Sequence, residues 1–436
     1  MLNSIRVLVF PSGTEIAIEI YDALKWQKDI EVFGATSAPD HSEMLYERLV
    51  SGLPYFYEEG FVEKLNEVIS RWSIDFVYPA RDDVQLFLTQ QCAKLRARVI
   101  TSPLHTVEVC RSKKATYKCL ANEFFVPYTF ESATDIGSFP VFCKPVVGEG
   151  SKGAQLVCSQ DELDRLIADD NDYVFCEYLP GVEWTVDCFT DMNGELVACL
   201  PRTRDRARSG IAMRSTTVDD SATTARIHAI GEAINKRLEF YGAWFFQLKA
   251  RDDGTPILME VSPRIPGTMG LSRNLGLNFP LLTIYQAMGM VVTVSPMSLD
   301  AMVDKALISR YKLDITYSTL YVDYDDTLVV HGKTNPLLIA FLYQCKNEGK
   351  HIVLLTRHDN RELGYLDDDM LSRGIAASLF DEIVHLGRED CKSDYVTERS
   401  AIFIDDSYRE RMEVAQRREI PTFDVSNIES LLDWRH

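Results

Sequence analysis

The feature that most constrains the fold of this chain is an apolar strand that carries one lysine and runs into a glycine-rich loop. The strand reads FPVFCKP over residues 139–145, and its single charge is Lys144. The loop contains Gly148, Gly150, Ser151 and Gly153, and a second strand is predicted over 154–158. A buried strand seldom keeps a lysine unless an anion meets it, and glycines let backbone N–H groups approach a ligand closely. On its own the segment fits either a phosphate cradle or an exposed hairpin with a flexible tip.

The overall composition is that of a soluble globular protein and excludes some partners. The 436 residues are 46% hydrophobic and 25% charged, and the formal net charge is −19. Nucleic acids and anionic membranes favour positive surfaces, so we expect neither as a partner. No run approaches the roughly 18 apolar residues of a membrane span. The ten cysteines form no CxxC pair, which suits thiols in a reducing cytoplasm.

Alternating strands and helices predict a parallel sheet in the first 105 residues. Predicted strands cover 4–10, 30–36 and 76–79, and predicted helices cover 14–26 and 61–72. This alternation is typical of a doubly wound sheet, in which ligands bind beyond the carboxyl ends of the strands. Ser12-Gly13 and Arg81-Asp82-Asp83 follow strands in this way, although plain turn residues fit these positions equally well.

The region from 106 to 312 contains, in order, the groups that a nucleotide site needs. A predicted helix over 106–125 carries Lys113, which with Lys144 is a candidate phosphate cation. Glu177 ends a predicted strand beside Tyr178 and Leu179, where backbone groups could read an adenine edge. Glu183 follows and could accept hydrogen bonds from ribose hydroxyls. The two glutamates also fit ordinary solvated strand ends.

A second group of residues suits a magnesium ion. Gln247 and Glu260 lie on two strands predicted to pair, and Ser262 points to the same face as Glu260 because side chains alternate along a strand. Converging oxygen ligands suit Mg²⁺. Gln247 also fits a half-exposed strand, whereas a carboxylate inside an apolar strand, such as Glu260, requires a metal or a cation.

These motifs together resemble the ATP-grasp superfamily, most closely its carbamoyl-phosphate synthase and carboxylate–amine ligase branch. The resemblance covers about residues 1–300 and rests on the lysine strand with its loop, on EYLPGVE over 177–183 and on LMEVSPR over 258–264. It implies a pre-ATP-grasp α/β domain with a parallel sheet over 1–105 and an ATP-grasp domain over 106–312. It also implies ATP and Mg²⁺, or Mn²⁺, as cofactors.

The resemblance further implies a role for each site residue. Lys113 and Lys144 would contact ATP phosphates under the mobile glycine loop, Glu177 and the backbone after it would meet adenine, and Glu183 would meet ribose. Gln247 and Glu260 would hold the metal, and Arg264 would stabilise the transferred phosphoryl group. The family usually has asparagine at the position of Ser262, a departure that puts a second metal in doubt.

An arginine-rich segment lies between these motifs. Residues 201–210 read PRTRDRARSG, and Arg214 follows shortly. Guanidinium groups bind carboxylates and phosphates with two parallel hydrogen bonds. We therefore expect Arg202, Arg204 and Arg214 to capture a substrate anion, and the alternative is a solvated basic loop.

A separate set of polar residues marks the last 120 residues. The predicted strand ends at Asp323 and Asp325, further strand runs end at Thr356 and at Asp405-Asp406, and Lys392 opens a helical stretch. Acidic pairs at strand ends are often helix caps, but paired carboxylates can also share magnesium beside a nucleophile.

This set resembles the haloacid dehalogenase-like (HAD) phosphatase superfamily over about residues 316–436, and implies a Rossmann-like domain. It implies Asp323 as nucleophile and Asp325 as general acid/base. Thr356 and Lys392 would bind phosphate, and Asp405 and Asp406 would join the two other aspartates at a magnesium ion. The short spacings leave no room for a large cap domain, so we expect an open site unless the preceding region covers it.

The sequence therefore predicts a multidomain α/β and α+β protein with two activities in the cytoplasm. The first is an ATP- and Mg²⁺-dependent ligase that joins a small-molecule carboxylate to an amine through an acyl phosphate. The second is a phosphatase for a related phosphorylated metabolite. Two alternatives remain open: an ATP-grasp kinase, and a C-terminal domain that binds or scaffolds without catalysis. The sequence leaves homo-oligomerisation open.

Overall fold

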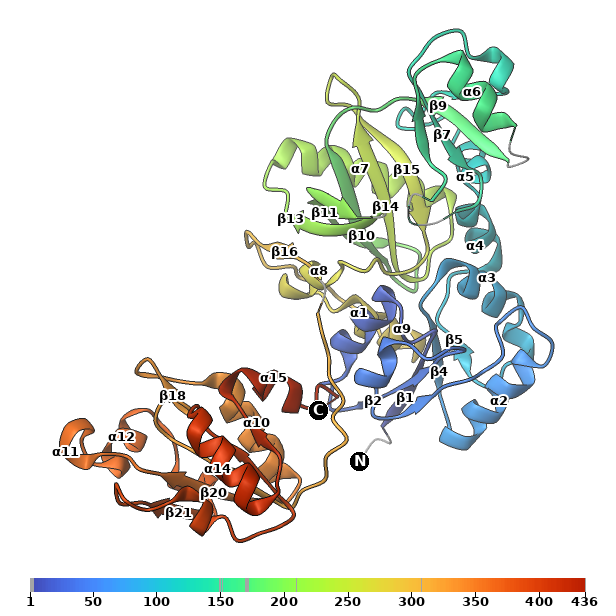
Figure 1. Ribbon diagram of the computed structural model, residues 1–436. Coiled ribbons are helices and arrows are strands. Elements are labelled where there is room, and N and C mark those ends of the chain that lie inside the picture. Colours follow the sequence, from blue (N-terminus) through green and yellow to red (C-terminus); the bar gives the residue numbers. More distant parts are fainter. Residues whose placement is uncertain are drawn as a thin grey trace. The chain divides into compact units, whose positions relative to one another are not determined.

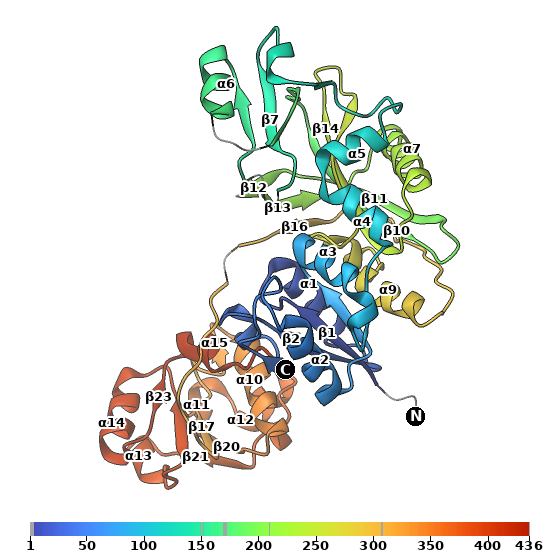
Figure 2. The same ribbon diagram turned by 90° about the vertical axis from the view of Figure 1, so that its right-hand side faces the viewer.

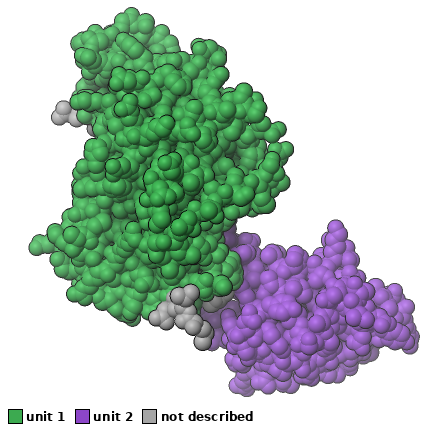
Figure 3. All heavy atoms as spheres, turned by 180° about the vertical axis from the view of Figure 1, so that it is seen from behind, with its two compact units in different colours: residues 1–307 green, residues 308–436 purple. Residues whose placement is uncertain are grey.

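The computed structural model describes residues 4–148, 150, 152–168, 172–208, 210–306 and 308–435. The chain divides into two compact units, residues 1–307 and 308–436 (Figure 3). The division falls a few residues before the predicted start of the last domain at 316. The region expected at 1–105 and all but the last five residues of the region expected at 106–312 belong to the same compact unit.

The first unit begins with a five-stranded parallel sheet in the order β3-β2-β1-β4-β5 (Figure 1). Its strands are β1 (Ile5–Phe10), β2 (Ile30–Ala35), β3 (Leu49–Val50), β4 (Phe76–Pro79) and β5 (Arg98–Val99). Its helices are α1 (Glu15–Leu24), α2 (Phe61–Trp72) and α3 (Asp82–Gln90), with short 3-10 turns at His41–Met44 and Cys92–Lys94. Central strand β1 is almost wholly apolar because helices cover both of its faces. The predicted parallel sheet is confirmed.

Two helices follow where the sequence predicted one. α4 (Leu104–Arg111) and α5 (Lys113–Cys119) are separated by Ser112, whose backbone is extended. The Ser112 hydroxyl accepts a hydrogen bond from the Ala115 N–H at 3.2 Å, so Ser112 caps α5. The predicted continuous helix over 106–125 is corrected, because an N-terminal cap requires a non-helical backbone.

Two antiparallel sheets make up most of the rest of the first unit (Figure 2). The smaller has the order β6-β9-β7-β8, from Thr129–Phe130, Tyr173–Glu177, Val141–Pro145 and Gln155–Val157, with a 3-10 turn at Ala133–Asp135 and α6 (Gln160–Ile167). The larger has the order β11-β10-β14-β15, from Leu196–Thr203, Glu183–Thr190, Gly242–Ala250 and Pro256–Ser262. α7 (Ser221–Arg237) packs its buried isoleucines against Trp244 and Phe246 of the larger sheet. α8 (Gly270–Asn274) and α9 (Phe279–Ala287) follow β15.

The arginine-rich segment forms strands. β12 (Arg206–Arg208), β13 (Ile211–Thr216) and β16 (Met302–Asp304) form a small antiparallel sheet. A solvated basic loop was the alternative for residues 201–210. β16 lies within the ATP-grasp region expected over 106–312 and belongs to the first unit.

The second unit has a five-stranded parallel sheet in the order β21-β20-β17-β22-β23. Its strands are Glu382–His385, His351–Thr356, Thr319–Val322, Ala401–Ile404 and Thr422–Phe423, and a separate hairpin joins β18 (Val329–Val330) to β19 (Lys333–Thr334). Its helices are α10 (Pro336–Asn347), α11 (Asn360–Leu363), α12 (Leu366–Ser372), α13 (Lys392–Tyr395), α14 (Tyr408–Arg418) and α15 (Ile428–Leu431), with 3-10 turns at Ala377–Leu379 and Val425–Asn427. Among the described residues, no helix combines the length and apolar character needed to cross a membrane.

Candidate functional site

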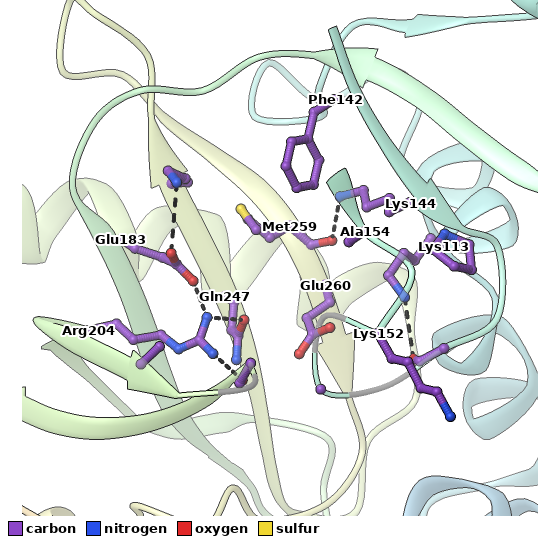
Figure 4. Close-up of a pocket in the computed structure, with 16 residues that line it drawn as sticks. Lys113, Phe142, Lys144, Lys152, Ala154, Glu183, Arg204, Gln247, Met259 and Glu260 are labelled. Atoms are coloured by element: carbon purple, nitrogen blue, oxygen red, sulfur yellow. Dashed lines mark hydrogen bonds and ion pairs between the residues drawn. The ribbon is translucent and has the colours of Figure 1, made fainter. Parts of the chain in front are cut away.

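A cavity of about 270 Å³ lies in the first unit, between the smaller and the larger antiparallel sheets (Figure 4). Its walls include Lys144 of β7, Glu183 of β10, Gln247 of β14 and Glu260 of β15. Lys113 at the start of α5 and Gly148 and Gly150 of the loop after β7 complete the lining on one side. Side chains that are up to 147 positions apart in sequence therefore face one space.

Lys113, Lys144 and the exposed Lys152 line this cavity without a carboxylate partner among the described residues, and the first two are at least partly buried. Lys144 is 5% exposed, and its Nζ donates to the Tyr117 hydroxyl at 2.5 Å and to the Met259 carbonyl at 3.2 Å. Lys113 Nζ donates to the Gly148 carbonyl at 3.4 Å. Burial lowers the pKa of both ammonium groups; Glu260 opposes this shift in both, and at Lys113 the nearby Lys144 adds to it. An anion in the cavity would relieve this unfavourable arrangement.

Gln247 and Glu260 lie directly opposite each other on β14 and β15. The described residues form no ion pair or hydrogen bond with the Glu260 carboxylate, which points into the cavity in Figure 4. The carboxamide oxygen of Gln247 lies 3.4 Å from Arg204. These oxygen donors fit a hard cation such as Mg²⁺.

Ser262 is held by Asp82, which follows the strand predicted over 76–79. Its hydroxyl donates to Asp82 Oδ1 at 2.8 Å, and Arg264 forms two hydrogen bonds to the same carboxylate at 2.9 and 2.5 Å. Burial would raise the pKa of Asp82, but Arg264 and Ser262 outweigh it, so the pKa lies below its ordinary value. This hydrogen bond uses the hydroxyl proton and leaves the lone pairs of the oxygen, so the metal-ligand role of Ser262 stays a prediction.

Arg202 is part of the core. Its side chain is 2% exposed and that of Asp187 is fully buried, and two hydrogen bonds of 3.0 and 3.1 Å join them. Ser215 accepts from Arg202 at 3.1 Å, and Ser272 donates to Asp187 at 2.7 Å. Arg202 lines neither this cavity nor the second one described below. The expectation of Arg202 as a substrate ligand is corrected, because its donors are already satisfied by buried acceptors.

The two other candidate arginines have different positions. Arg204 lines the cavity and bonds to Glu183 and to the Gly210 carbonyl. Arg214 is half exposed, pairs with Asp304 of β16 and lies outside both cavities. The expectation of Arg214 as a substrate ligand is corrected in the same way, since it links β13 to β16.

The proposed adenine-binding residues lie at the end of β9. The Glu177 carboxylate pairs with Arg251 at 2.6 Å and accepts from the Tyr128 N–H at 2.8 Å. Burial would raise the pKa of Glu177, but Arg251 and Tyr128 outweigh it. Neither Glu177 nor its neighbours Tyr178 and Leu179 is among the described residues that line the cavity. Glu183 does line it.

The glycine loop is the hairpin connection between β7 and β8. Gly150 and Gly153 have φ values of 61° and 75°, a left-handed backbone that favours glycine. Gly148 and Gly150 line the cavity, whereas Ser151 lies outside the described residues. The strand–loop–strand arrangement is therefore as expected.

A second cavity of about 290 Å³ adjoins the first. The two share the lining residues Gly150, Arg204, Gly210, Gln247 and Glu260. The second extends to the carboxyl ends of β1 and β4, where Thr14, Glu15, Arg81 and Asp82 line it. Strand ends of the parallel sheet thus contribute to the site, as expected for α/β sheets.

The second unit contains an acidic cluster at the carboxyl ends of β17 and β22. One carboxylate oxygen each from Asp323, Asp405 and Asp406 lies within 4.8 Å of the others. Lys392 Nζ lies 2.8 Å from Asp323 and 2.6 Å from Asp405. Burial raises the pKa of Asp323 to about 7 although Lys392 opposes the shift. Asp323 and Asp405 are buried and Asp406 is exposed, and three carboxylates this close together suit a divalent cation.

The Asp325 carboxylate lies outside this cluster. The expectation that its side chain binds the metal is therefore corrected. Both of its oxygens are 3.0 Å from Nδ1 of His358, whose Nε2 lies 2.9 Å from the Gly364 carbonyl oxygen. Thr356 is buried at the end of β20, and its hydroxyl accepts from the His358 N–H at 3.2 Å.

Sequence reasoning missed several residues of the two sites. In the first unit these are Tyr117, Met259 and Lys249, and in the second His358, whereas Asp82 was named from the sequence only as a residue after a strand. The position of Asp82 after strand β4 was the one available signal, because strand ends in such sheets often face ligands.

Comparisons with known proteins agree with this geometry. Residues 169–307 match the family model described as "ATP-grasp in the biosynthetic pathway with Ter operon". No curated protein sequence matches the chain significantly.

Solved structures similar to the chain include the following three. A biotin carboxylase from Campylobacter jejuni, in complex with β,γ-ATP, has a TM-score of 0.59 at 15% identity, covering 68% of this chain and 74% of its own. The biotin carboxylase domain of Hydrogenobacter thermophilus 2-oxoglutarate carboxylase, with MgADP and bicarbonate, has a TM-score of 0.58 at 17% identity, covering 68% and 73%. An L-amino acid ligase from Bacillus licheniformis has a TM-score of 0.54 at 21% identity, covering 66% and 74%. The chain therefore contains the ATP-grasp fold.

Proposed function

We propose that the first unit is an ATP- and Mg²⁺-dependent ligase that joins a small-molecule carboxylate to an amine. The observation that carries this proposal is the pair Lys113 and Lys144, which face one cavity without a carboxylate partner in the described residues. Buried ammonium groups in this arrangement favour a polyanion such as a triphosphate. The ATP-grasp fold supports the same conclusion.

Glu260 and Gln247 would hold the metal ion, with Mn²⁺ as a possible substitute for Mg²⁺. Their oxygens lie on paired strands beside the two lysines, and the Glu260 carboxylate lacks a partner among described residues. A bound divalent cation would neutralise phosphate charge during transfer. Ser262, whose hydroxyl donates its proton to Asp82, would offer its oxygen as a third protein ligand, and phosphate oxygens and water would complete the coordination.

The proposed reaction has two steps. A carboxylate oxygen attacks the γ-phosphorus of ATP, and ADP leaves, which gives an acyl phosphate. The amine nitrogen then attacks the acyl carbon, inorganic phosphate leaves, and the nitrogen loses a proton, which gives the amide. Arg264, held by Asp82 in the wall of the second cavity, would stabilise the charge of the transferring group. Glu183 would meet the ribose.

An ADP-release screen over carboxylates and amines, with products identified by mass spectrometry, tests this proposal. We expect ADP formation that requires both substrates and a product with the mass of an amide. Glu260→Gln should abolish ADP formation, and Glu195→Gln in the exposed turn before β11 should leave it unchanged. A phosphorylated carboxylate or alcohol as the stable product would instead show a kinase.

We further propose that the second unit is a HAD-type phosphatase acting on a related phosphorylated metabolite. The observation that favours it is the buried Asp323–Lys392–Asp405 group with Asp406 close by. In this proposal Asp323 is the nucleophile, Asp325 the general acid/base, and Thr356 and Lys392 bind the phosphate. Magnesium held by Asp323, Asp405 and Asp406 would offset the charge of the phosphate.

Hydrolysis of p-nitrophenyl phosphate with Mg²⁺, followed by a screen of phosphorylated metabolites, tests the second activity. Asp323→Asn should abolish hydrolysis and spare the ligase. Asp326→Asn, at an exposed neighbouring position, should preserve it. If no ester is hydrolysed while phosphorylated compounds still bind, the unit is a binding module.

A further inference from the structure

We infer that the second cavity binds the amine substrate and that this substrate carries an additional positive charge, which Glu15 recognises. This inference rests on the proposed ligase function and adds the class of its second substrate. The argument depends on which charges in the cavity already have partners.

Each arginine that lines the second cavity is paired with a carboxylate. Arg264 bonds to Asp82, Arg204 to Glu183, and Arg81 to Asp83. These pairs cancel charge locally, so the arginines provide little net attraction for a second anion in this space. Of the three carboxylates that line the cavity, Asp82 is the one that such a pair neutralises.

The two other carboxylates of the lining, Glu15 and Glu260, have no ion pair or hydrogen bond within the part of the chain that the structure describes. Glu260 faces the lysines at the junction with the first cavity and has a role there. Glu15 lies at the other end, toward the parallel sheet. The second cavity therefore has, at its far end, a carboxylate without an ion-pair partner among the described residues, although Lys305 Nζ bonds to the nearby Gly267 carbonyl. A carboxylate in this position favours a cation.

The position of Glu15 is fixed by the start of α1. Thr14 caps this ten-residue helix by accepting from the Ala17 N–H at 3.1 Å, and its hydroxyl donates to the Ala80 carbonyl at 2.9 Å. A methyl group added at Gly267 would lie 3.5 Å from Oε2 of Glu15, so the carboxylate lies against the bare backbone of another wall residue. A glutamate in the first turn also complements the helix dipole, but that role does not require a cavity in front of it.

A second polar group in the cavity also lacks a partner. Thr185 on β10 is 1% exposed and lines the cavity, and no described group bonds to its hydroxyl. A buried hydroxyl without a partner costs about 1–3 kcal/mol, so a ligand that bonds to it is favoured. The hydroxyl can accept from an amine N–H, and it lies on the strand pair that also carries Gln247.

Apolar residues form much of the remaining wall, so the part of the ligand between its polar groups should be apolar. Ile16, Ile211, Phe245 and Pro266 contribute to the lining. A short aliphatic chain fits these walls in a cavity of about 290 Å³. The nitrogen that attacks an acyl phosphate must be neutral, so the charge that Glu15 recognises belongs to a second group. Aliphatic diamines and basic amino acids have this chemistry.

Equilibrium binding of 1,4-diaminobutane to the full chain, in the presence of Mg²⁺ and a non-hydrolysable ATP analogue, tests the inference. Titration calorimetry should show that wild-type protein binds the diamine at least 10-fold more tightly than 1,4-butanediol or succinate. Glu15→Gln should weaken diamine binding at least 10-fold and leave the affinity for the ATP analogue unchanged. Asp22→Asn, which removes a carboxylate from the same helix outside the cavity, should change neither affinity.

The possible results separate this inference from the proposed function. If the ATP analogue binds but Glu15→Gln binds the diamine as wild type does, or succinate binds more tightly than the diamine, the inference is wrong and the ligase proposal stands. If Asp22→Asn weakens diamine binding as much as Glu15→Gln, the attraction is a general effect of the acidic surface, which also overturns the inference. Failure of the ATP analogue to bind contradicts the proposed function itself.

Discussion

Arg202 gives the sharpest test of how charge is distributed in the first unit. The sequence predicts that Arg202 binds a substrate anion, whereas the structure places its side chain in the core. Arg202→Met removes the guanidinium and leaves the Asp187 carboxylate buried, with the Ser272 hydroxyl at 2.7 Å as its remaining side-chain partner. Breaking one side of a buried ion pair costs about 3–5 kcal/mol. In a unit of this size that lowers the melting temperature by on the order of 10 °C.

Arg214→Met is the matched control. Arg214 pairs with Asp304, and their side chains are 46% and 30% exposed, against 2% and 0% for Arg202 and Asp187. Such a solvated pair contributes about 0.2–1 kcal/mol. The same substitution should therefore have a several-fold smaller effect on stability at position 214.

Urea unfolding followed by tryptophan fluorescence measures both variants. Four of the five tryptophans, Trp26, Trp72, Trp184 and Trp244, lie in the first unit, so the signal reports mainly on that unit. Adding Asp187→Asn to Arg202→Met should recover part of the lost stability, because it removes the unpaired charge. The reasoning is refuted if Arg202→Met is as stable as Arg214→Met, or if it loses substrate affinity with its stability intact.

Three further predictions concern other buried charges. Lys144→Met should weaken binding of Mg·ATP about 10- to 100-fold, as expected for loss of a charge-assisted hydrogen bond, and should leave the melting temperature unchanged. Calorimetry and thermal unfolding measure both quantities, with Lys118→Met as the control. A large loss of stability in Lys144→Met would show a structural role for Lys144. Burial raises the pKa of Glu19 from 4.5 to about 7, so between these pH values the folded state keeps a proton that the unfolded state releases. The contribution of Glu19 to stability is fully present below pH 4.5 and falls by about 3 kcal/mol as the pH rises from 4.5 to 7. Urea titrations at pH 5 and pH 8 should show this slope and its reduction in Glu19→Gln, and an unchanged slope would contradict it. Asp405→Asn should weaken Mg²⁺ binding to the second unit at least 10-fold, measured by calorimetry, and should leave Mg·ATP binding unchanged. If Asp405→Asn binds Mg²⁺ as tightly as the wild type, Asp405 is not part of the proposed metal site.

Local patterns predicted the elements well because each element follows from its own residues. The β1–α1–β2 alternation, the hairpin around Gly150 and the pairing of Gln247 with Glu260 depend on strand period and turn residues, which sequence shows directly. The break between α4 and α5 was missed although Ser112 is a typical cap, because the helical spacing continues across it.

Long-range partners could not be predicted in this way. Arg202 and Arg204 are two positions apart in an arginine-rich segment, and only the fold shows that one meets buried Asp187 and the other faces a cavity. Asp82 meets Ser262 across 180 positions, a contact that no local pattern indicates. The partner of a charged side chain, more than its own identity, decides whether it stabilises the core or binds a ligand.

The central claim is that the first unit activates a carboxylate by direct phosphorylation, and an oxygen-18 transfer experiment tests it most directly. The carboxylate found in the ADP-release screen is labelled at both oxygens and converted with ATP, Mg²⁺ and the amine. The account predicts one labelled oxygen in each released inorganic phosphate and one in the amide, because the acyl phosphate breaks at the carbon. Unlabelled phosphate, or release of AMP and pyrophosphate in place of ADP, would contradict it.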